Sequence, residues 1–90
     1  MTELYRISVA SEARRGLHRL PAKVAAAIIE FITTAVADNP NRVSKPLTGH
    51  LAECRSARRG DYRVLIRIDE PTHTVLIVRV AHRAEAYRPS

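Results

Sequence analysis

The stretch SARRGDYRVLIRI, residues 56–68, joins a basic cluster, a turn signal and an alternating strand. Gly60 and Asp61 are typical of a tight turn, and residues 61–68 alternate in the manner of a half-buried strand. One face of this strand carries Tyr62 and aliphatic residues, while the other carries Arg63 and Arg67. A rigid surface that presents guanidinium groups favours a polyanion as its ligand.

The segments on either side predict the rest of the fold. Residues 4–10 alternate as a first strand, and Ser11 is a suitable N-cap for a short helix that ends at Pro21. An apolar stripe at helical spacing predicts a second helix from Ala22 to Asp38. Residues 41–50 are expected to form a loop, and strands are expected over residues 51–57, 61–68 and 74–81.

Residues 69–73 are expected to form a five-residue hairpin loop, and residues 83–90 a short tail with about one helical turn. The order strand, helix, helix and three strands predicts a small α+β domain. Its sheet is mostly antiparallel, and a helical hairpin covers one face. Ninety residues are enough for a single domain, so one domain is expected over residues 1–90.

Charge and composition narrow the class of partner. The chain carries a net charge of +6 with a pI near 10.4, which favours nucleic acid or a strongly acidic protein. Aromatic residues make up 4% of the chain and tryptophan is absent, so base stacking on an aromatic platform is not the expected binding mode.

Several other classes are disfavoured by the sequence. The single cysteine, Cys54, permits no internal disulfide, and the histidines show no metal-ligand spacing. Neither a metal nor a cofactor is therefore expected. Apolar runs fall short of the roughly 18 residues that a membrane helix needs, and no signal peptide is recognisable, so a cytoplasmic protein that avoids membranes is expected.

The hairpin permits a prediction about the arginines. If Ile68 lies opposite Thr74, then Arg63 faces Arg79, and this like-charged pair calls for an anion between the strands. Arg83 would join the same face if the strand stays extended. The alternative is that these arginines form structural ion pairs with Asp61, Asp69 or Glu85. The basic side chains expected to contact a nucleic acid are Lys45, Arg55, Arg58, Arg59, Arg67 and Arg79.

Other side chains have possible chemical or binding roles. His82 or Glu85 could act as a general acid or base, and the Tyr87 phenol could bind a phosphate or stack on a base. In the second predicted helix, Ala25, Ala26 and Ile29 give an apolar side that either packs internally or awaits a partner.

Three motifs resemble those of the RelE/ParE superfamily of bacterial toxins. The segment SARRGDYRV, residues 56–64, is similar to the superfamily's S-x-R-x-G-D-Y-R-V segment, and residues 45–49, KPLTG, resemble its K-P-L-x-G loop. LHRLP, residues 17–21, resembles its helix-to-helix junction. The ending with His82, Arg83 and Tyr87 is similar to its usual basic–aromatic tail. The residues at these motif positions are most similar to those of RelE-type toxins of mycobacteria and related actinobacteria.

The resemblance implies a RelE-like fold of the microbial-ribonuclease type and the activity of a toxin that cleaves messenger RNA in the ribosomal A site. Cleavage would be metal-independent and would use the ribose 2′-hydroxyl as nucleophile. By position in the motifs, Arg63 and Arg83 correspond to phosphate-binding arginines, and Tyr87 to a tyrosine near the scissile nucleotide. The implied partners are an acidic RelB-like antitoxin, which would cover Ala25, Ala26 and Ile29, the 70S ribosome with its messenger, and operator DNA bound through the toxin–antitoxin complex.

The sequence departs from the superfamily pattern at the acid/base positions. Some relatives carry paired lysines where this chain has residues 54–57, CRSA, and others carry a glutamate where it has His50. His82 and Glu85 are therefore the first candidates for the general base, with Tyr87 third. Two alternatives stay open: a ParE-like inhibitor of DNA gyrase that cuts no RNA, and a degenerate toxin that acts mainly as a corepressor with its antitoxin.

Overall fold

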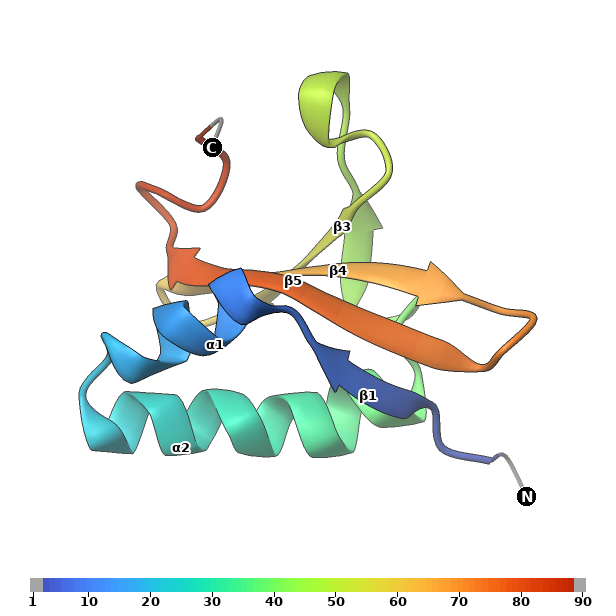
Figure 1. Ribbon diagram of the computed structural model, residues 1–90, viewed down its shortest axis with the longest axis horizontal. Helices are drawn as coiled ribbons and strands as arrows, with labels where there is room; N and C mark the ends of the chain where they lie inside the picture. Colours follow the sequence, from blue (N-terminus) through green and yellow to red (C-terminus); the bar gives the residue numbers. More distant parts are fainter. Residues whose placement is uncertain (1–2, 89–90) are drawn as a thin grey trace.

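A five-stranded mixed sheet organises the computed structural model, which describes residues 3–88 (Figure 1). Its strand order is β1-β5-β4-β3-β2; β1 runs parallel to β5, and every other neighbouring pair is antiparallel. The elements in chain order are β1 (Arg6–Val9), α1 (Ser11–His18), α2 (Ala22–Phe31), the π-helical η1 (Ile32–Val36), β2 (Ser44–Pro46), the 3₁₀ turn η2 (Gly49–Leu51), β3 (Arg55–Arg59), β4 (Tyr62–Asp69) and β5 (Thr74–His82).

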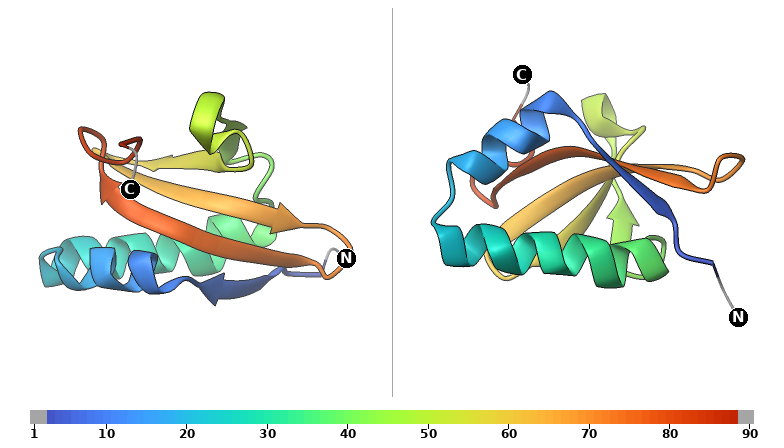
Figure 2. Two further views of the ribbon diagram at one scale, coloured as in Figure 1. Left: turned by 45° about the horizontal axis from the view of Figure 1, so that its top comes forward. Right: turned by 60° about the horizontal axis from the view of Figure 1, so that its bottom comes forward.

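Both helices cover the same face of the sheet, as the α+β prediction required (Figure 2). The core between the layers joins Ala13 of α1 and Ile28 of α2 to strand residues such as Val64 and Ile77. The C-terminal segment, residues 83–88, and η2 rise on the opposite face, which leaves a second surface of the sheet partly covered (Figure 2). The predicted tail extends to Ser90, and its last two residues lie outside the described part.

The turn predicted at Gly60 and Asp61 is confirmed. β3 ends at Arg59 and β4 begins at Tyr62. Gly60 has a φ of +61°, a backbone conformation that a residue without a Cβ adopts at little cost. The turn sets the pairing of the two strands, so that Arg58 lies opposite Arg63.

The predicted register of the β4–β5 hairpin is wrong. Asp69, and not Ile68, pairs with Thr74, because the turn is one residue tighter and His73 adopts a φ of +54°. A bulge then shifts the register by one further residue, so Leu65 lies opposite Arg79 and Arg63 lies opposite Ala81. The predicted Arg63–Arg79 pair does not form.

Other boundaries also differ from the sequence expectation. The strand expected over residues 51–57 begins only at Arg55, as β3, because residues 49–51 form η2. Ser11 is the first residue of α1 and not its N-cap, because the Ala10 N–H donates to the Ile77 carbonyl at 2.9 Å and extends the ladder of β1 by one residue. The region expected to be loop contains β2, whose Pro46 is tolerated because β2 is an edge strand. The helix from Ala22 continues to Asp38 as predicted, with η1 as a π-helical section.

Gly16 explains how closely α1 approaches the sheet. A Cβ atom on this residue would lie 2.3 Å from the Val80 carbonyl oxygen. The glycine that weakens the short helix is thus the residue that lets it lie against β5. Within residues 3–88, no helix is long and apolar enough to cross a membrane.

Candidate functional site

A basic groove of about 500 Å³ lies where β2, β3, β4 and the C-terminal segment meet. Strand alternation builds it: Ala57 of β3 is buried in the core, whereas Ser56 and Arg58 point to the other face. The residues that line the basic groove are Arg42, Val43, Ser44, Lys45, Pro46, Leu47, Ser56, Arg58, Arg63 and Tyr87.

The lining carries positive charge without a carboxylate. Arg42, Lys45, Arg58 and Arg63 all contribute to the basic groove, and none of its lining residues is Asp or Glu. Arg58 and Arg63 face each other across the β3–β4 ladder. Like charges in that position repel, so an anion bound between them would relieve the repulsion. The sequence argument for an anion between facing arginines therefore applies to this pair and not to Arg63 and Arg79.

Arg63 is held in place by the β3–β4 turn. Its Nη1 donates to the carbonyl oxygens of Gly60 at 3.1 Å and Tyr62 at 3.0 Å, and the residue is half-buried. A guanidinium group has five N–H donors, and the remaining ones are available to a phosphate. The turn motif thus orients the arginine before any ligand arrives.

Two hydroxyl groups complete the basic groove. The Tyr87 and Ser56 oxygens lie 2.8 Å apart, at hydrogen-bond distance, with either able to donate. Tyr87 is 39% exposed, while the preceding Ala86 is fully buried and anchors the C-terminal segment. The Ala86 N–H donates to the His82 carbonyl at 3.0 Å, forming the turn that brings Tyr87 back over β3.

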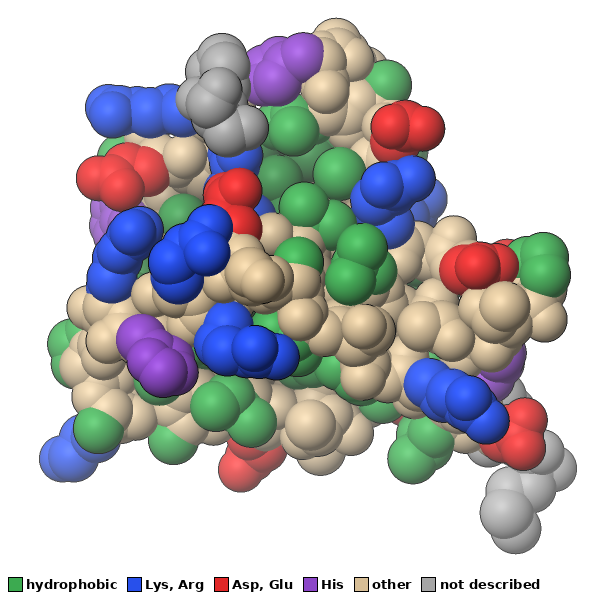
Figure 3. Space-filling model, viewed as in Figure 1, with side chains coloured by type: hydrophobic (Ala, Val, Ile, Leu, Met, Phe, Trp, Pro, Cys, Tyr) green, Lys and Arg blue, Asp and Glu red, His purple; other side chains and the backbone are tan. Residues whose placement is uncertain are grey.

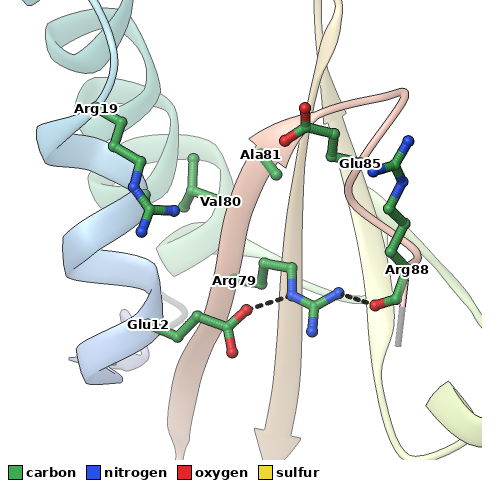
Figure 4. Close-up of a pocket in the computed structure, with 8 residues that line it drawn as sticks. Glu12, Arg19, Arg79, Val80, Ala81, Glu85 and Arg88 are labelled. Atoms are coloured by element: carbon green, nitrogen blue, oxygen red, sulfur yellow. Dashed lines mark hydrogen bonds and ion pairs between the residues drawn. The ribbon is translucent and has the colours of Figure 1, made fainter. Parts of the chain in front are cut away.

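The other predicted acid/base residues lie elsewhere. His82 pairs with Tyr62 across the ladder, and their rings meet edge-on at 5.6 Å on the helix-covered face. Glu85 lines a separate cavity between α1 and β5 (Figure 4). Arg83 is exposed, and its backbone N–H donates to the Asp61 carbonyl at 2.8 Å. None of these three lines the basic groove.

Two of the predicted RNA-contacting arginines make structural hydrogen bonds. Arg55 donates from Nε to the Ser44 hydroxyl at 2.7 Å, and from Nη2 to the carbonyls of Ser44 at 3.0 Å and Asn41 at 3.3 Å. Arg79 donates from Nε to the Glu12 carboxylate, an ion pair between β5 and α1 (Figure 4). The ion pair of Arg79 is of the structural kind that the sequence left open, but its partner is Glu12 and not Asp61, Asp69 or Glu85. The bonds of Arg55 to a hydroxyl and two carbonyls were not predicted.

The remaining arginines of the predicted set lie outside the basic groove. Arg59 points to the helix side and shares a small apolar cavity with Lys23 and Ile28 of α2. Arg67 is exposed, with Glu53 at 3.9 Å. Figure 3 shows Lys and Arg side chains spread over one face of the molecule, with Asp and Glu between them and apolar side chains exposed in the centre.

Sequence reasoning missed several lining residues, among them Ser56 and Arg42. Ser56 lies two positions from Arg58, so strand alternation starting from the basic cluster would have placed it on the same face. Arg42 follows the second helix in a segment without periodicity, and no sequence signal indicated it. Within residues 3–88, no group of His, Cys, Asp and Glu side chains is arranged to hold a metal ion.

The apolar side of α2 is partly open to solvent. Ile29 is 48% exposed, Ala26 is exposed and Ala25 is half-buried, whereas Ile28 on the inner side is buried. The exposed residues thus form a surface patch that the core does not require.

Comparison with known proteins places the chain among toxins. Residues 7–87 match the family described as ParE toxin of type II toxin–antitoxin system, parDE. The chain is 45% identical over 84 residues to Toxin RelE of Mycobacterium tuberculosis, covering 93% of this chain and 87% of that toxin. It is 49% identical over 84 residues to Toxin RelG of the same organism, covering 93% and 97%.

Solved structures agree with this placement. The chain is similar to one in the crystal structure of the toxin–antitoxin complex RelBE2 from M. tuberculosis, with a TM-score of 0.87, 46% identity, and 94% and 98% of the two chains covered. The archaeal RelE–RelB complex from Pyrococcus horikoshii OT3 gives a TM-score of 0.69 at 23% identity, with 92% and 99% covered, and supports the fold alone.

Proposed function

The chain belongs to the ParE toxin family of type II toxin–antitoxin systems and is a toxin of the RelBE type, and from this premise we propose that it is a ribosome-dependent endoribonuclease. It would cleave messenger RNA in the A site and so stop translation in the cytoplasm. The observation that carries the proposal is the facing pair Arg58 and Arg63 beside the Tyr87 hydroxyl, in a groove without carboxylates.

The groove suits phosphodiester cleavage by a neighbouring hydroxyl. The ribose 2′-oxygen loses its proton and bonds to phosphorus, the bond to the 5′-oxygen breaks, and that oxygen leaves with a proton. Negative charge grows on the non-bridging oxygens, where the guanidinium groups of Arg58 and Arg63 stabilise it. This route leaves a cyclic phosphate on one product and a free 5′-hydroxyl on the other.

Tyr87 is the acid/base candidate that the basic groove retains. Its hydroxyl bonds to Ser56 and lies among the cations, whereas His82 and Glu85 lie outside. We assign Tyr87 the role of handling a proton at a reacting oxygen. Arg83, exposed at the start of the C-terminal segment, can reach the messenger or the ribosome from the rim. The ribosome would supply the in-line alignment that so small a groove does not impose.

We propose that the antitoxin is RelB-like, because the chain resembles a chain of the toxin–antitoxin complex RelBE2, and acidic, because this chain carries a net charge of +6. We propose that it covers the α2 patch of Ala25, Ala26 and Ile29, because burying an exposed isoleucine is favourable. The complex would bind operator DNA through the antitoxin. Hydrogen exchange should show added protection over residues 25–29 when the antitoxin binds, and unchanged exchange there would refute this placement.

The test of the proposed activity is a cell-free translation reaction with primer extension on the messenger. The wild type should give discrete cuts at the A-site codon. Arg63→Ala and Tyr87→Phe should strongly reduce those cuts, whereas Arg6→Lys, a conservative change at an exposed position of β1, should leave them. Cuts that persist in both groove variants would refute the assignment of the site.

Intact messenger with wild-type toxin would refute the ribonuclease. The next hypothesis is then that the protein inhibits DNA gyrase, as in the ParE branch of the superfamily. A supercoiling assay with purified DNA gyrase tests it. Inhibited supercoiling would identify a ParE-like inhibitor. Active gyrase together with intact messenger would leave operator binding with the antitoxin as the function to measure.

A further inference from the structure

Arg79 connects α1 to both sides of Tyr87. Its Nη1 donates to the carbonyl oxygen of Ala86 at 2.8 Å and to that of Arg88 at 2.7 Å. Its Nε bonds to a carboxylate oxygen of Glu12 at 2.5 Å (Figure 4). The guanidinium therefore bridges the carbonyls that flank Tyr87 in the chain and is itself anchored to the first turn of α1.

The surroundings of Arg79 make it a poor phosphate ligand. Its side chain is only 12% exposed, two of its nitrogens already donate, and a carboxylate lies against it. It also lines the cavity with Glu85, on the other side of the C-terminal segment from the basic groove. The Arg79 guanidinium is therefore already bonded to groups of the protein and is poorly placed to bind a phosphate.

We propose that Arg79 is a positioning residue that holds the C-terminal segment so that the Tyr87 hydroxyl stays against Ser56 in the basic groove, with Glu12 as its anchor. This inference rests on the proposed function for its catalytic meaning, but the geometry can be tested without any cleavage. The segment is also attached by the Arg83 N–H, by the Glu85 and Ala86 N–H groups that donate to the His82 carbonyl, and by the burial of Ala86. The Arg79 bonds are the ones that hold the carbonyls on both sides of Tyr87.

The first test follows the three tyrosines by ¹³C NMR on tyrosine-labelled protein, with Tyr87→Phe assigning one signal. In Arg79→Lys the ammonium keeps the charge but cannot span Glu12 and both carbonyls, because it lacks the planar fork of donors. The Tyr87 signal should move toward that of unstructured tyrosine, while Tyr5 and Tyr62 stay in place. An unmoved Tyr87 signal would overturn the proposal.

Two further variants keep this test decisive. Glu12→Gln leaves Arg79 present but weakens its anchor, so it should shift the Tyr87 signal in the same direction and by less. If Arg79→Lys does not fold, Glu12→Gln replaces it in the test. An unmoved Tyr87 signal in Glu12→Gln would then overturn the proposal. Arg6→Lys, the matched change at an exposed position of β1, should move none of the three signals.

The second test is a double-mutant cycle on cleavage in programmed ribosomes. Arg79→Lys should slow cleavage at saturating ribosome concentration by about tenfold, the order expected for losing bonds to a charged donor, with the half-saturating concentration unchanged. In a Tyr87→Phe background it should cost nothing further. Additive losses, or a raised half-saturating concentration, would overturn the proposal in favour of a direct RNA contact.

The two tests fail separately. If the wild type cuts no messenger, the proposed function fails, yet the NMR signals still decide whether Arg79 holds Tyr87. If cuts occur but the Tyr87 signal does not move in Arg79→Lys, the positioning role of Arg79 is refuted while the proposed ribonuclease activity stands.

Discussion

Gly16→Ala should unfold the protein more easily, although alanine is the better helix former. The gain in helix propensity would be about 1 kcal/mol in an isolated helix. The new Cβ, however, would lie 2.3 Å from the Val80 carbonyl oxygen. This oxygen belongs to the β5 backbone, so it cannot be moved by a change of side-chain rotamer. Overpacking of this kind costs about 3 kcal/mol at its upper end.

The net loss is therefore about 2 kcal/mol, or a fall in melting temperature of roughly 8–16 °C for a domain of this size. Thermal and urea unfolding followed by circular dichroism measure it. Arg15→Ala, on the exposed side of the same helix, is the control and should change stability by less than about 0.5 kcal/mol. A melting temperature equal to or above that of the wild type would show that α1 does not lie against β5 as described.

Three other perturbations have definite outcomes. Arg55→Ala should lower the free energy of unfolding by about 2 kcal/mol, since it leaves the buried Ser44 without its donor; unchanged urea unfolding with weakened ribosome binding would instead restore Arg55 as an RNA contact. The hydrogen bond to Glu70 raises the pKa of Tyr5, so its stabilising effect is full below the ordinary tyrosine pKa and is lost as pH rises through the raised value. Urea unfolding should accordingly show the wild type losing stability relative to Tyr5→Phe as the pH rises from the ordinary tyrosine pKa through the raised value, and parallel curves at all pH values would contradict the linkage. Ile29→Asp should weaken antitoxin binding by about tenfold or more in calorimetry, while the free energy of unfolding stays within about 0.5 kcal/mol of the wild type. Undiminished affinity would exclude this patch as the interface.

Local patterns were enough to predict the architecture. The alternation after Gly60, the apolar stripe of α2 and the order of elements led to the α+β fold with helices on one face, and the structure agrees. β2 was missed because a three-residue edge strand ending at Pro46 has too short a pattern to detect.

The site was less predictable because it depends on register. A tighter turn at His73 and one bulged residue place Arg79 opposite Leu65 and not opposite Arg63, while the separate turn at Gly60 places Arg58 opposite Arg63. The two shifts of one residue add up to two, so Arg79 keeps its face but lies two positions from Ala81, the residue opposite Arg63, and neither cause has a clear signature in the sequence. The position of Tyr87 beside Ser56 depends on a turn in the C-terminal segment, which periodicity cannot describe.

The most direct test of the account compares two neighbouring arginines of β3. Arg58 lines the basic groove, and Arg59 points to the helix side. In single-turnover cleavage on programmed ribosomes, Arg58→Ala should slow the reaction by about tenfold or more, the loss expected for a charged donor. Arg59→Ala should stay within about threefold, because a surface charge acts only weakly at a distance. Equal losses, or a larger loss for Arg59, would contradict the placement of the reaction in the groove between Arg58, Arg63 and Tyr87.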